Sequence, residues 1–306
     1  MPTLRFLILL LLSSLVTAFG QVPQSARTHP AASGEGSLKV ITGHAGSVVF
    51  INNIRHGTTS DKGEVDLRHV RVGSFPVRVR TAGYVDWKGS VTVRPGGDRS
   101  LNVNQTPTSD EALLHYQRAE DLRDRAKNDD AIKEYQQALA ARPDFPEAEI
   151  GMARSLITMQ RFDQAEKQLA AASHAGPHQP EAQTVLANLR RYQGLVDESI
   201  VEYRKALRLA ALRLAAGVSA EAHVGLAIAL EESGKTDEAI KEYRAGIAQD
   251  MDTEPILYYL LGSLLEKHNR NKEAIDAYRE YLRLDPEGQY ASAVESMIEK
   301  LKEERQ

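Results

Sequence analysis

The pattern of hydrophobic and polar residues changes its period once along the chain. Between residues 37 and 105, hydrophobic positions alternate with polar ones in short runs, as at Val77 and Val79 or at Val91 and Val93. Glycines separate these runs, and six or seven short strands at this spacing predict a small antiparallel β-sandwich. From residue 111 onward the hydrophobic positions follow a helical period, which predicts an all-α region. The expected fold class is therefore a multidomain chain, with a small β-sandwich followed by helices.

Two polar segments flank the predicted sandwich. Residues 21–36 are rich in Pro, Ala, Ser and Gly and have no hydrophobic period, so we expect a flexible linker. Residues 106–110 form a second, shorter linker. Thr108 and Glu111 have the spacing of a capping box, which predicts that the first helix begins there.

The first twenty residues have the organisation of an export signal. Arg5 precedes a hydrophobic run from residue 6 to residue 16, and small residues at Ala18 and Gly20 suit cleavage before Gln21. The alternative is a retained membrane anchor, although the run is short for a bilayer span of about 20 residues. We expect residues 1–20 to be removed and no later segment to span a membrane. The chain has no cysteine, and export without disulfides favours a periplasmic or secreted bacterial protein.

Turn and strand motifs in the predicted sandwich occur in a recognisable order. Residues 57–63 form a glycine-bounded turn, residues 65–67 and 73–79 alternate as strands, and residues 82–84 form a tight turn before Tyr84. In this order they resemble the carboxypeptidase regulatory-like domain, a transthyretin-type sandwich, and nearly as closely the PEGA domain. The resemblance implies an accessory module without peptidase activity. The sequence shows none of the zinc-ligand motifs of a carboxypeptidase.

The helical region contains an internal repeat. A small residue recurs at positions 131, 165, 199, 239 and 274, so the intervals are 34, 34, 40 and 35 residues. Each small residue is followed four positions later by a large one, usually tyrosine. This pattern resembles the tetratricopeptide repeat, in which two antiparallel helices cross closely at small residues. The resemblance implies five repeats within residues 111–287, at about 112–145, 146–179, 180–213, 220–253 and 255–288, followed by a capping helix over residues 288–306.

The 40-residue interval indicates an insertion in the third repeat. No helix breaker occurs between Leu207 and Gly217, so we expect the second helix of this repeat to continue through the extra residues. Simple lengthening is one interpretation. A protruding ridge that contacts the sandwich or a partner is the other.

No constellation of catalytic residues is apparent. His174 and His178 have helical metal-ligand spacing, but Gly176 and Pro177 between them break the helix that would align them. Phosphate-binding glycine loops, zinc-protease motifs and nucleophile elbows are missing. A net charge of −4 gives no general attraction to nucleic acid. We therefore expect a protein that is not an enzyme, with no cofactor, no metal and no nucleic-acid partner.

The family resemblance directs attention to the concave surface of the solenoid. In tetratricopeptide repeats the second, fifth, ninth and twelfth positions of each first helix face this groove. Three successive repeats place arginines there, which predicts a basic wall for an acidic segment of a protein or peptide partner. The candidate groove residues are Tyr116, Glu120, Arg123, Ile150, Arg154, Ile157, Asn188, Arg191, Ile228, Glu231 and Tyr259.

The sequence thus favours a noncatalytic adaptor of the cell envelope that binds a partner in its groove. A carbohydrate-binding protein is the alternative, because sandwich domains of this superfamily sometimes bind glycans. Tyr84 and Trp87 are the aromatic residues that would stack on a sugar, although each is equally suited to a core or corner position. The sequence leaves the oligomeric state open.

Overall fold

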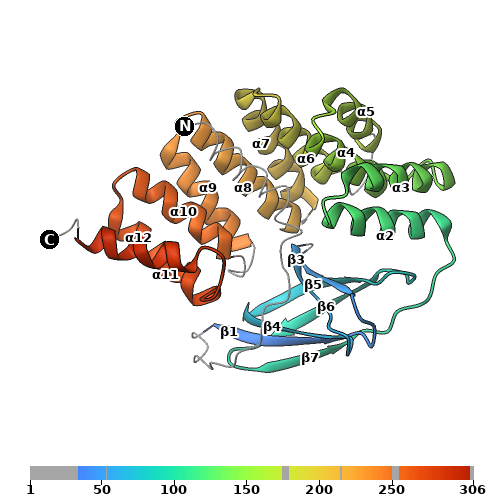
Figure 1. The fold of residues 1–306 in the computed structure, drawn as a ribbon, viewed down its shortest axis with the longest axis horizontal. Helices are drawn as coiled ribbons and strands as arrows, with labels where there is room; N and C mark the ends of the chain where they lie inside the picture. The colour runs from blue at the N-terminus through green and yellow to red at the C-terminus, as the bar shows by residue number, and fades with distance from the viewer. Residues whose placement is uncertain (1–33, 53, 174–178, 214–215, 250–254, 304–306) are drawn as a thin grey trace.

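The computed structural model describes residues 34–52, 54–173, 179–213, 216–249 and 255–303. In these residues a small β-domain precedes an array of helix pairs, and the helices arch over the β-domain (Figure 1). The fold therefore has the two parts that the hydrophobic periods predict. The signal segment and most of the first linker lie outside the described residues, as do His174 and His178.

Seven strands form two packed sheets. One sheet has the order β4-β1-β7 and the other has the order β3-β2-β5-β6. The hydrophobic residues of their facing sides, among them Val40, Ile51 and Val79, are almost fully buried. The strands are β1 (Glu35–Ile41), β2 (Val48–Ile51), β3 (Ile54–Thr58), β4 (Glu64–Arg71), β5 (Gly73–Arg80), β6 (Trp87–Val93) and β7 (Asp98–Asn102).

Two details of the β-domain differ from the sequence-based expectation. β1 begins at Glu35, inside the segment expected to be linker. β1 also pairs parallel with β7, whereas the other strand pairs are antiparallel. β1 lies between β4, with which it pairs antiparallel, and β7, with which it pairs parallel. The alternation of side chains predicts strands and their buried faces, but it carries no information on strand direction.

The helices of the described residues form five antiparallel pairs and a final single helix. The first helices of the pairs are α2 (Glu111–Asp124), α4 (Pro146–Thr158), α6 (Gln179–Tyr192), α8 (Ala216–Glu232) and α10 (Pro255–Lys267). The second helices are α3 (Asn128–Ala141), α5 (Phe162–Ala172), α7 (Val196–Arg213), α9 (Thr236–Gln249) and α11 (Asn271–Leu284). The last helix, α12 (Ala291–Glu303), packs on α11 and buries Val294, Ile298 and Leu301. It therefore covers the hydrophobic end that a terminal repeat would otherwise expose.

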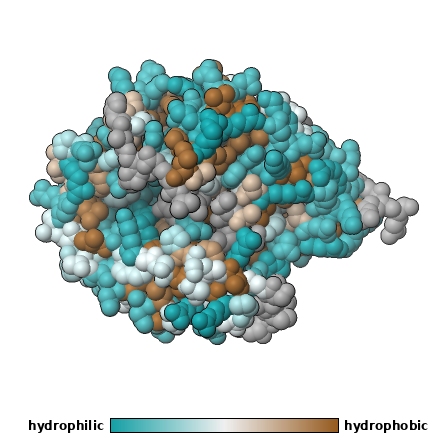
Figure 2. All heavy atoms as spheres, turned by 180° about the vertical axis from the view of Figure 1, so that it is seen from behind, coloured by the Kyte–Doolittle hydropathy of each residue, from teal (hydrophilic) through white to brown (hydrophobic). Residues whose placement is uncertain are grey.

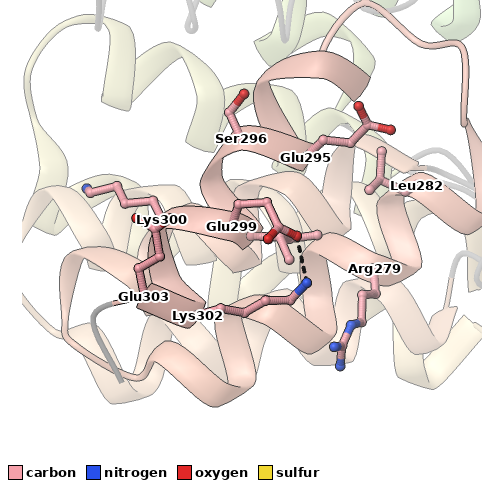
Figure 3. A pocket seen from close by; sticks show the side chains of 9 residues that line it. Arg279, Leu282, Glu295, Ser296, Glu299, Lys300, Lys302 and Glu303 are labelled. Carbon is pink, nitrogen blue, oxygen red and sulfur yellow. Dashed lines mark hydrogen bonds and ion pairs between the residues drawn. The ribbon is translucent and has the colours of Figure 1, made fainter. Parts of the chain in front are cut away.

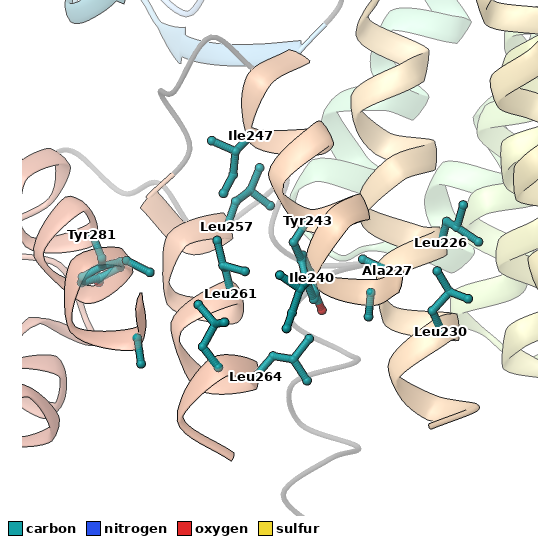
Figure 4. Close-up of a cluster of buried hydrophobic side chains, with 14 of the residues drawn as sticks. Leu226, Ala227, Leu230, Ile240, Tyr243, Ile247, Leu257, Leu261, Leu264 and Tyr281 are labelled. Atoms are coloured by element: carbon teal, nitrogen blue, oxygen red, sulfur yellow. The ribbon is translucent and has the colours of Figure 1, made fainter. Parts of the chain in front are cut away.

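The repeat pattern has a direct packing cause. Ala131, Ala165, Ser199, Ala239 and Ala274 are completely buried, because the paired helices cross where these side chains are small. The tyrosines at 135, 203, 243 and 278 are also buried. Tyr135 lies in the hydrophobic cluster of the first repeats, and the other three lie in the cluster of the later repeats, which Figure 4 shows around Tyr243. α3 ends two residues before Pro143 and α11 ends two residues before Pro286, since proline cannot continue the backbone hydrogen bonding of a helix.

The insertion in the third repeat lengthens two helices and not one. α7 has 18 residues and α8 has 17, whereas the other helices of the array have 11 to 14. Gly217, expected beyond the helix, lies in the first turn of α8. The extra residues are thus divided between the end of α7 and the start of α8.

The first helix is capped by a different residue from the one expected. The Asp110 carboxylate accepts a hydrogen bond from the backbone N–H of Leu113 at 3.2 Å. Thr108 does not cap the helix, because its hydroxyl accepts from the backbone N–H of Asp110 at 3.1 Å. Aspartate satisfies the free N–H groups of a first turn as well as threonine does, and here it lies directly before Glu111.

Candidate functional site

The predicted groove residues all lie on the first helices of their repeats. Among them, Tyr116 and Glu120 contact the β-domain. The exposure of the predicted residues differs along the solenoid. Glu120, Ile150, Ile157 and Arg191 are buried. The remaining candidates are partly exposed, and they are Tyr116, Arg123, Arg154, Asn188, Ile228, Glu231 and Tyr259.

The three arginines predicted to form a basic wall are each engaged by carboxylates of this chain. Arg123 contacts Glu120 at 3.0 Å, one turn earlier on the same helix. Arg154 donates two hydrogen bonds to the Glu221 carboxylate, at 2.6 and 2.8 Å, and so joins the second repeat to the fourth. This geometry is the bidentate fork that gives the strongest arginine–carboxylate contacts. The wall is thus a set of internal ion pairs.

The third arginine is the most buried of the three. Arg191 contacts Glu232 at 3.4 Å, and its side chain is only 4 % exposed. Asn188, one turn earlier on the same helix, donates to Glu221 at 3.3 Å and accepts a hydrogen bond from the Tyr203 hydroxyl. The middle of the concave surface is therefore a connected polar network that links the second, third and fourth repeats.

One ion pair of this surface, in which both side chains are nearly buried, is made with the β-domain. Arg80, at the end of β5, donates to the Glu120 carboxylate at 2.8 Å, and both side chains are less than 10 % exposed. The Tyr135 hydroxyl donates to the second oxygen of the same carboxylate. The Arg80 guanidinium also lies 5.3 Å from the centre of the Tyr116 ring, a distance at which a cation is attracted to an aromatic face. The Glu120 carboxylate therefore accepts hydrogen bonds from both domains.

The charge of Glu120 is fixed by its neighbours. Burial alone raises the pKa of a carboxyl, but the guanidinium groups of Arg123 and Arg80 outweigh this effect and lower the pKa of Glu120 to about 2. The same carboxylate raises the pKa of Arg80, against the opposing effect of burial. The pair is thus fully charged at neutral pH.

Further contacts surround this pair at the first repeat. Arg55 of β3 donates to Asp124 at 2.8 Å. The Gln117 side chain accepts from the backbone N–H of Gly83 at 3.0 Å and donates to the carbonyl of Tyr84 at 2.8 Å. Asp124 lies in the last turn of α2, where the helix dipole disfavours an acidic side chain, and burial raises its pKa. Arg123 of the same helix and Arg55 of the β-domain supply the compensating positive charge.

The β-domain also contacts the far end of the solenoid. Arg283 of α11 contacts Glu35 of β1 at 3.0 Å, and His69 contacts the same carboxylate at 2.9 Å. Arg71 donates to the backbone carbonyl of Ala248 at 3.0 Å, near the end of α9. Because unpaired carbonyls carry partial negative charge at a helix C-terminus, this is a favourable place for arginine. The β-domain thus reaches both ends of the arch that Figure 1 shows.

The aromatic residues of the carbohydrate alternative have partners inside the β-domain. The Trp87 ring lies over Gly89 of its own strand, where an added Cβ would come within 2.2 Å of a ring carbon. Trp87 also packs against the core of the sandwich. The Tyr84 ring lies 4.3 Å from the ring of His44. Both rings therefore have structural roles.

A shallow hollow lies between α11 and α12. Arg279 and Leu282 on one side and Glu295, Glu299 and Lys302 on the other are among its lining residues (Figure 3). Lys302 forms an ion pair with Glu299 at 2.6 Å across one turn of α12. The lining is largely charged and exposed to solvent.

The described residues contain no group of three or more histidine, aspartate or glutamate side chains arranged to hold a metal ion. None of the described helices combines the length and the hydrophobicity that crossing a membrane requires. Hydrophilic residues dominate the rear surface, with hydrophobic residues in separate groups between them (Figure 2).

The contacts between the domains were missed by the sequence analysis. Arg80 and Glu120 are 40 positions apart, and Arg283 and Glu35 are 248 apart. One signal was nevertheless present. Arg78 and Arg80 alternate with the buried Val77 and Val79. Both arginines must therefore lie on the outer face of this strand, where two positive charges favour contact with an acidic surface.

Comparisons with known proteins agree with this architecture. Tetratricopeptide-repeat models match residues 122–189, 202–252 and 224–289. A PEGA-domain model matches residues 35–109, which decides between the two resemblances noted for the sandwich. No curated protein matches the chain by sequence.

Solved structures resemble the helical part at low sequence identity. PilF of Pseudomonas aeruginosa has a TM-score of 0.52 and 14 % identity, over 64 % of this chain and 86 % of that one. Yeast Tom70 has a TM-score of 0.56 and 19 % identity, over 64 % of this chain and 41 % of that one. A tetratricopeptide-repeat protein of Thermus thermophilus has a TM-score of 0.51 and 18 % identity, over 61 % of this chain and 98 % of that one. The chain is therefore a tetratricopeptide-repeat protein with an N-terminal PEGA domain.

Proposed function

We propose that this protein is a noncatalytic scaffold of the cell envelope, and that the concave surface of its solenoid binds a protein partner. Tetratricopeptide repeats indicate a protein–protein interaction scaffold, and the family is generally noncatalytic. PEGA domains occur in extracellular or periplasmic proteins, which together with the signal-like residues 1–20 supports a place in the envelope.

One observation carries the proposal. The array is already in contact with a folded protein domain, the sandwich of the same chain. First helix α2 contacts it through the ion pairs of Glu120 and Asp124, and second helix α11 contacts it at the other end through Arg283. A surface that accepts one folded domain has the shape and the charged groups needed to accept another. We therefore propose binding as the function, with the first helices as the surface for the partner.

The structure changes the kind of partner that the surface suits. Arg123, Arg154 and Arg191 are occupied by Glu120, Glu221 and Glu232, so an acidic segment would have to displace carboxylates that are already in place. The fourth and fifth repeats are different. They present the partly buried hydrophobic residues Val224, Ile228, Ile256 and Tyr259 against the core of the solenoid. We therefore place the principal partner contact at this hydrophobic strip, with Glu231 beside it.

A site-specific crosslinking experiment tests the proposal. A photoreactive amino acid replaces Ile228 on α8, and in a second strain it replaces Lys241 on α9, an exposed position on the second helix of the same repeat. After irradiation of intact cells, we expect a discrete crosslinked protein from position 228 and none from position 241. An equal pattern from both positions, or no adduct from position 228, would contradict the proposed surface.

A further inference from the structure

The outer face of the four-stranded sheet bears a cluster of arginine side chains and one aromatic ring. The Arg78 guanidinium lies 3.8 Å from the centre of the Phe50 ring. The guanidinium of Arg80, two residues further along β5, lies 5.2 Å from the same centre. Arg78 also contacts Asp86 at 3.0 Å. Stacked guanidinium groups on one ring form a rigid basic surface, and this surface lies against α2.

The complementary surface belongs to the first repeat. Glu120 receives Arg80, and Asp124, one turn further along the same helix, receives Arg55. Tyr116 and Gln117, on the preceding turn, contact Arg80 and the backbone of the loop at Gly83 and Tyr84. Successive turns of α2 are thus matched to strands β3 and β5 and to the loop that follows β5.

We propose that the PEGA domain is an intramolecular ligand of the solenoid, held in the concave surface by these contacts, and that partner binding requires its release. The inference rests on the proposed function for the partner, but the intramolecular contact itself does not depend on any partner. Contacts at both ends restrain the domain. Arg80, Arg55 and Gln117 hold it at the first repeat, whereas Arg71 and Glu35 hold it at the fourth and fifth repeats.

The consequence for access follows from this placement. While Arg80 occupies Glu120, a partner that approaches the first repeat meets a neutralised carboxylate and a folded domain. Release of the domain exposes the Glu120 and Asp124 carboxylates together, and the basic face of the sheet at the same time. A partner whose contact extends from the hydrophobic strip to this position therefore has to provide an arginine of its own, since guanidinium is the group that satisfies this carboxylate and its neighbouring tyrosine.

Distance measurements between spin labels test the intramolecular contact. The natural chain contains no cysteine, so Lys62→Cys in the turn before β4 and Gln136→Cys on α3 give two specific labels at exposed positions. In the full chain at low salt we expect one narrow distance distribution. Arg80→Met, which keeps the aliphatic stem and removes the charge, together with Arg283→Gln should shift the distribution to longer distances and at least double its width.

Two controls keep the result specific. Lys88→Glu changes the charge of an exposed residue on the same sheet and should leave the distribution unchanged. Arg283→Gln alone, at a half-buried surface pair, supplies a variant that folds if Arg80→Met does not. An unchanged distribution in the double variant would overturn the proposal, and so would a distance seen between chains that carry one label each, because the domain would then dock on a second copy.

The photocrosslinking assay separates this inference from the proposed function. In the Arg80→Met/Arg283→Gln background, we expect at least twofold more adduct from position 228 than in the natural chain. A longer label distance without any adduct would retain the intramolecular contact and contradict the proposed function. Adduct formation with an unchanged label distance would retain the proposed function and contradict the intramolecular contact.

Discussion

Glu120 shows how much one residue can decide in this molecule. Its carboxylate accepts from Arg80 of the sandwich, from Arg123 of its own helix and from the Tyr135 hydroxyl of α3. Removal of its charge leaves two guanidinium groups without their main counter-charge in a buried site. Loss of one partner from a buried ion pair typically costs about 3–5 kcal/mol.

We therefore expect Glu120→Gln to lower the free energy of unfolding by about 3 kcal/mol at pH 7, as measured by urea denaturation. The pH dependence has a defined sign. The folded-state pKa of Glu120, about 2, is below its usual value of 4.5, so its contribution is complete above about pH 4.5 and is lost as the pH falls toward 2. The variant should therefore lose less stability than the natural chain between pH 4.5 and pH 2.

Glu273 provides a matched control for this prediction. Its pKa is also lowered to about 2, because Arg270 and Arg244 donate hydrogen bonds to its carboxylate. Its side chain is 40 % exposed, however, and exposed ion pairs are worth about 0–1 kcal/mol. Glu273→Gln should therefore change the unfolding free energy by less than about 1 kcal/mol. Equal effects of the two substitutions would show that burial at the domain contact is not what makes Glu120 important.

The identity of these residues was only partly predictable. The helical period placed Glu120, Arg154 and Asn188 on the first helices of their repeats, because the period is a local property of the sequence. Their partners were not predictable in the same way. Glu221 lies 67 positions from Arg154, and the curvature that brings the second and fourth repeats together results from packing along the whole array.

At the scale of elements, the packing of successive helices requires glycine at a few positions. Gly225 of α8 lies against the Tyr203 ring of the preceding repeat, and an added Cβ would come within 2.4 Å of that ring. Gly151 has the same relation to Tyr135, at 2.5 Å. These glycines are required for close approach of successive repeats and not for an unusual backbone angle.

We expect Gly225→Ala to destabilise the solenoid by about 1–3 kcal/mol, because overpacking forces the Tyr203 ring from its position. Gly246→Ala on α9 is the comparison. Its Cβ would come nearest to the end of the Val224 side chain, at 3.1 Å, and alanine favours a helix over glycine by about 1 kcal/mol. Urea midpoints measured by circular dichroism should fall for the first variant and remain equal or rise for the second.

Element boundaries were predictable where a residue physically stops a helix, as at Pro143 and Pro286. They were less predictable where several neighbouring residues could cap the helix. Asp110 caps α2 in place of Thr108, since both residue types satisfy the same N–H groups. The insertion before the fourth repeat contains alanine and leucine without a breaker, so its sequence could not show that α8 begins at Ala216.

At the scale of the whole molecule, the two domains are joined by a linker and by charged contacts. The periods of the sequence predicted each domain separately, because each domain follows from its own local pattern. The docking of one on the other could not be predicted this way. It depends on which outward charges of the sandwich meet which inward charges of the solenoid, and alternation or helical period says nothing about that pairing.

The docking makes a measurable prediction about cooperativity. The chain has a single tryptophan, Trp87, and it packs on the sandwich core, so its fluorescence reports the unfolding of the sandwich. Circular dichroism at helical wavelengths reports the solenoid. If the ion pairs couple the domains, the two signals should follow one urea transition in the natural chain. In Arg80→Met/Arg283→Gln they should separate, with midpoints that differ by more than the error of the fits.

A control variant and two alternative outcomes define what this measurement shows. Lys88→Glu, on the same sheet but exposed, should keep the two transitions together. Separate transitions already present in the natural chain would mean that the contacts at Glu120 and Glu35 hold the domains in place without transmitting stability between them. A single transition that survives in the double variant would assign the coupling to the remaining contacts of Arg55, Arg71 and Gln117. In either case Trp87 and the helices report on different halves of one molecule, so the comparison measures the interface directly.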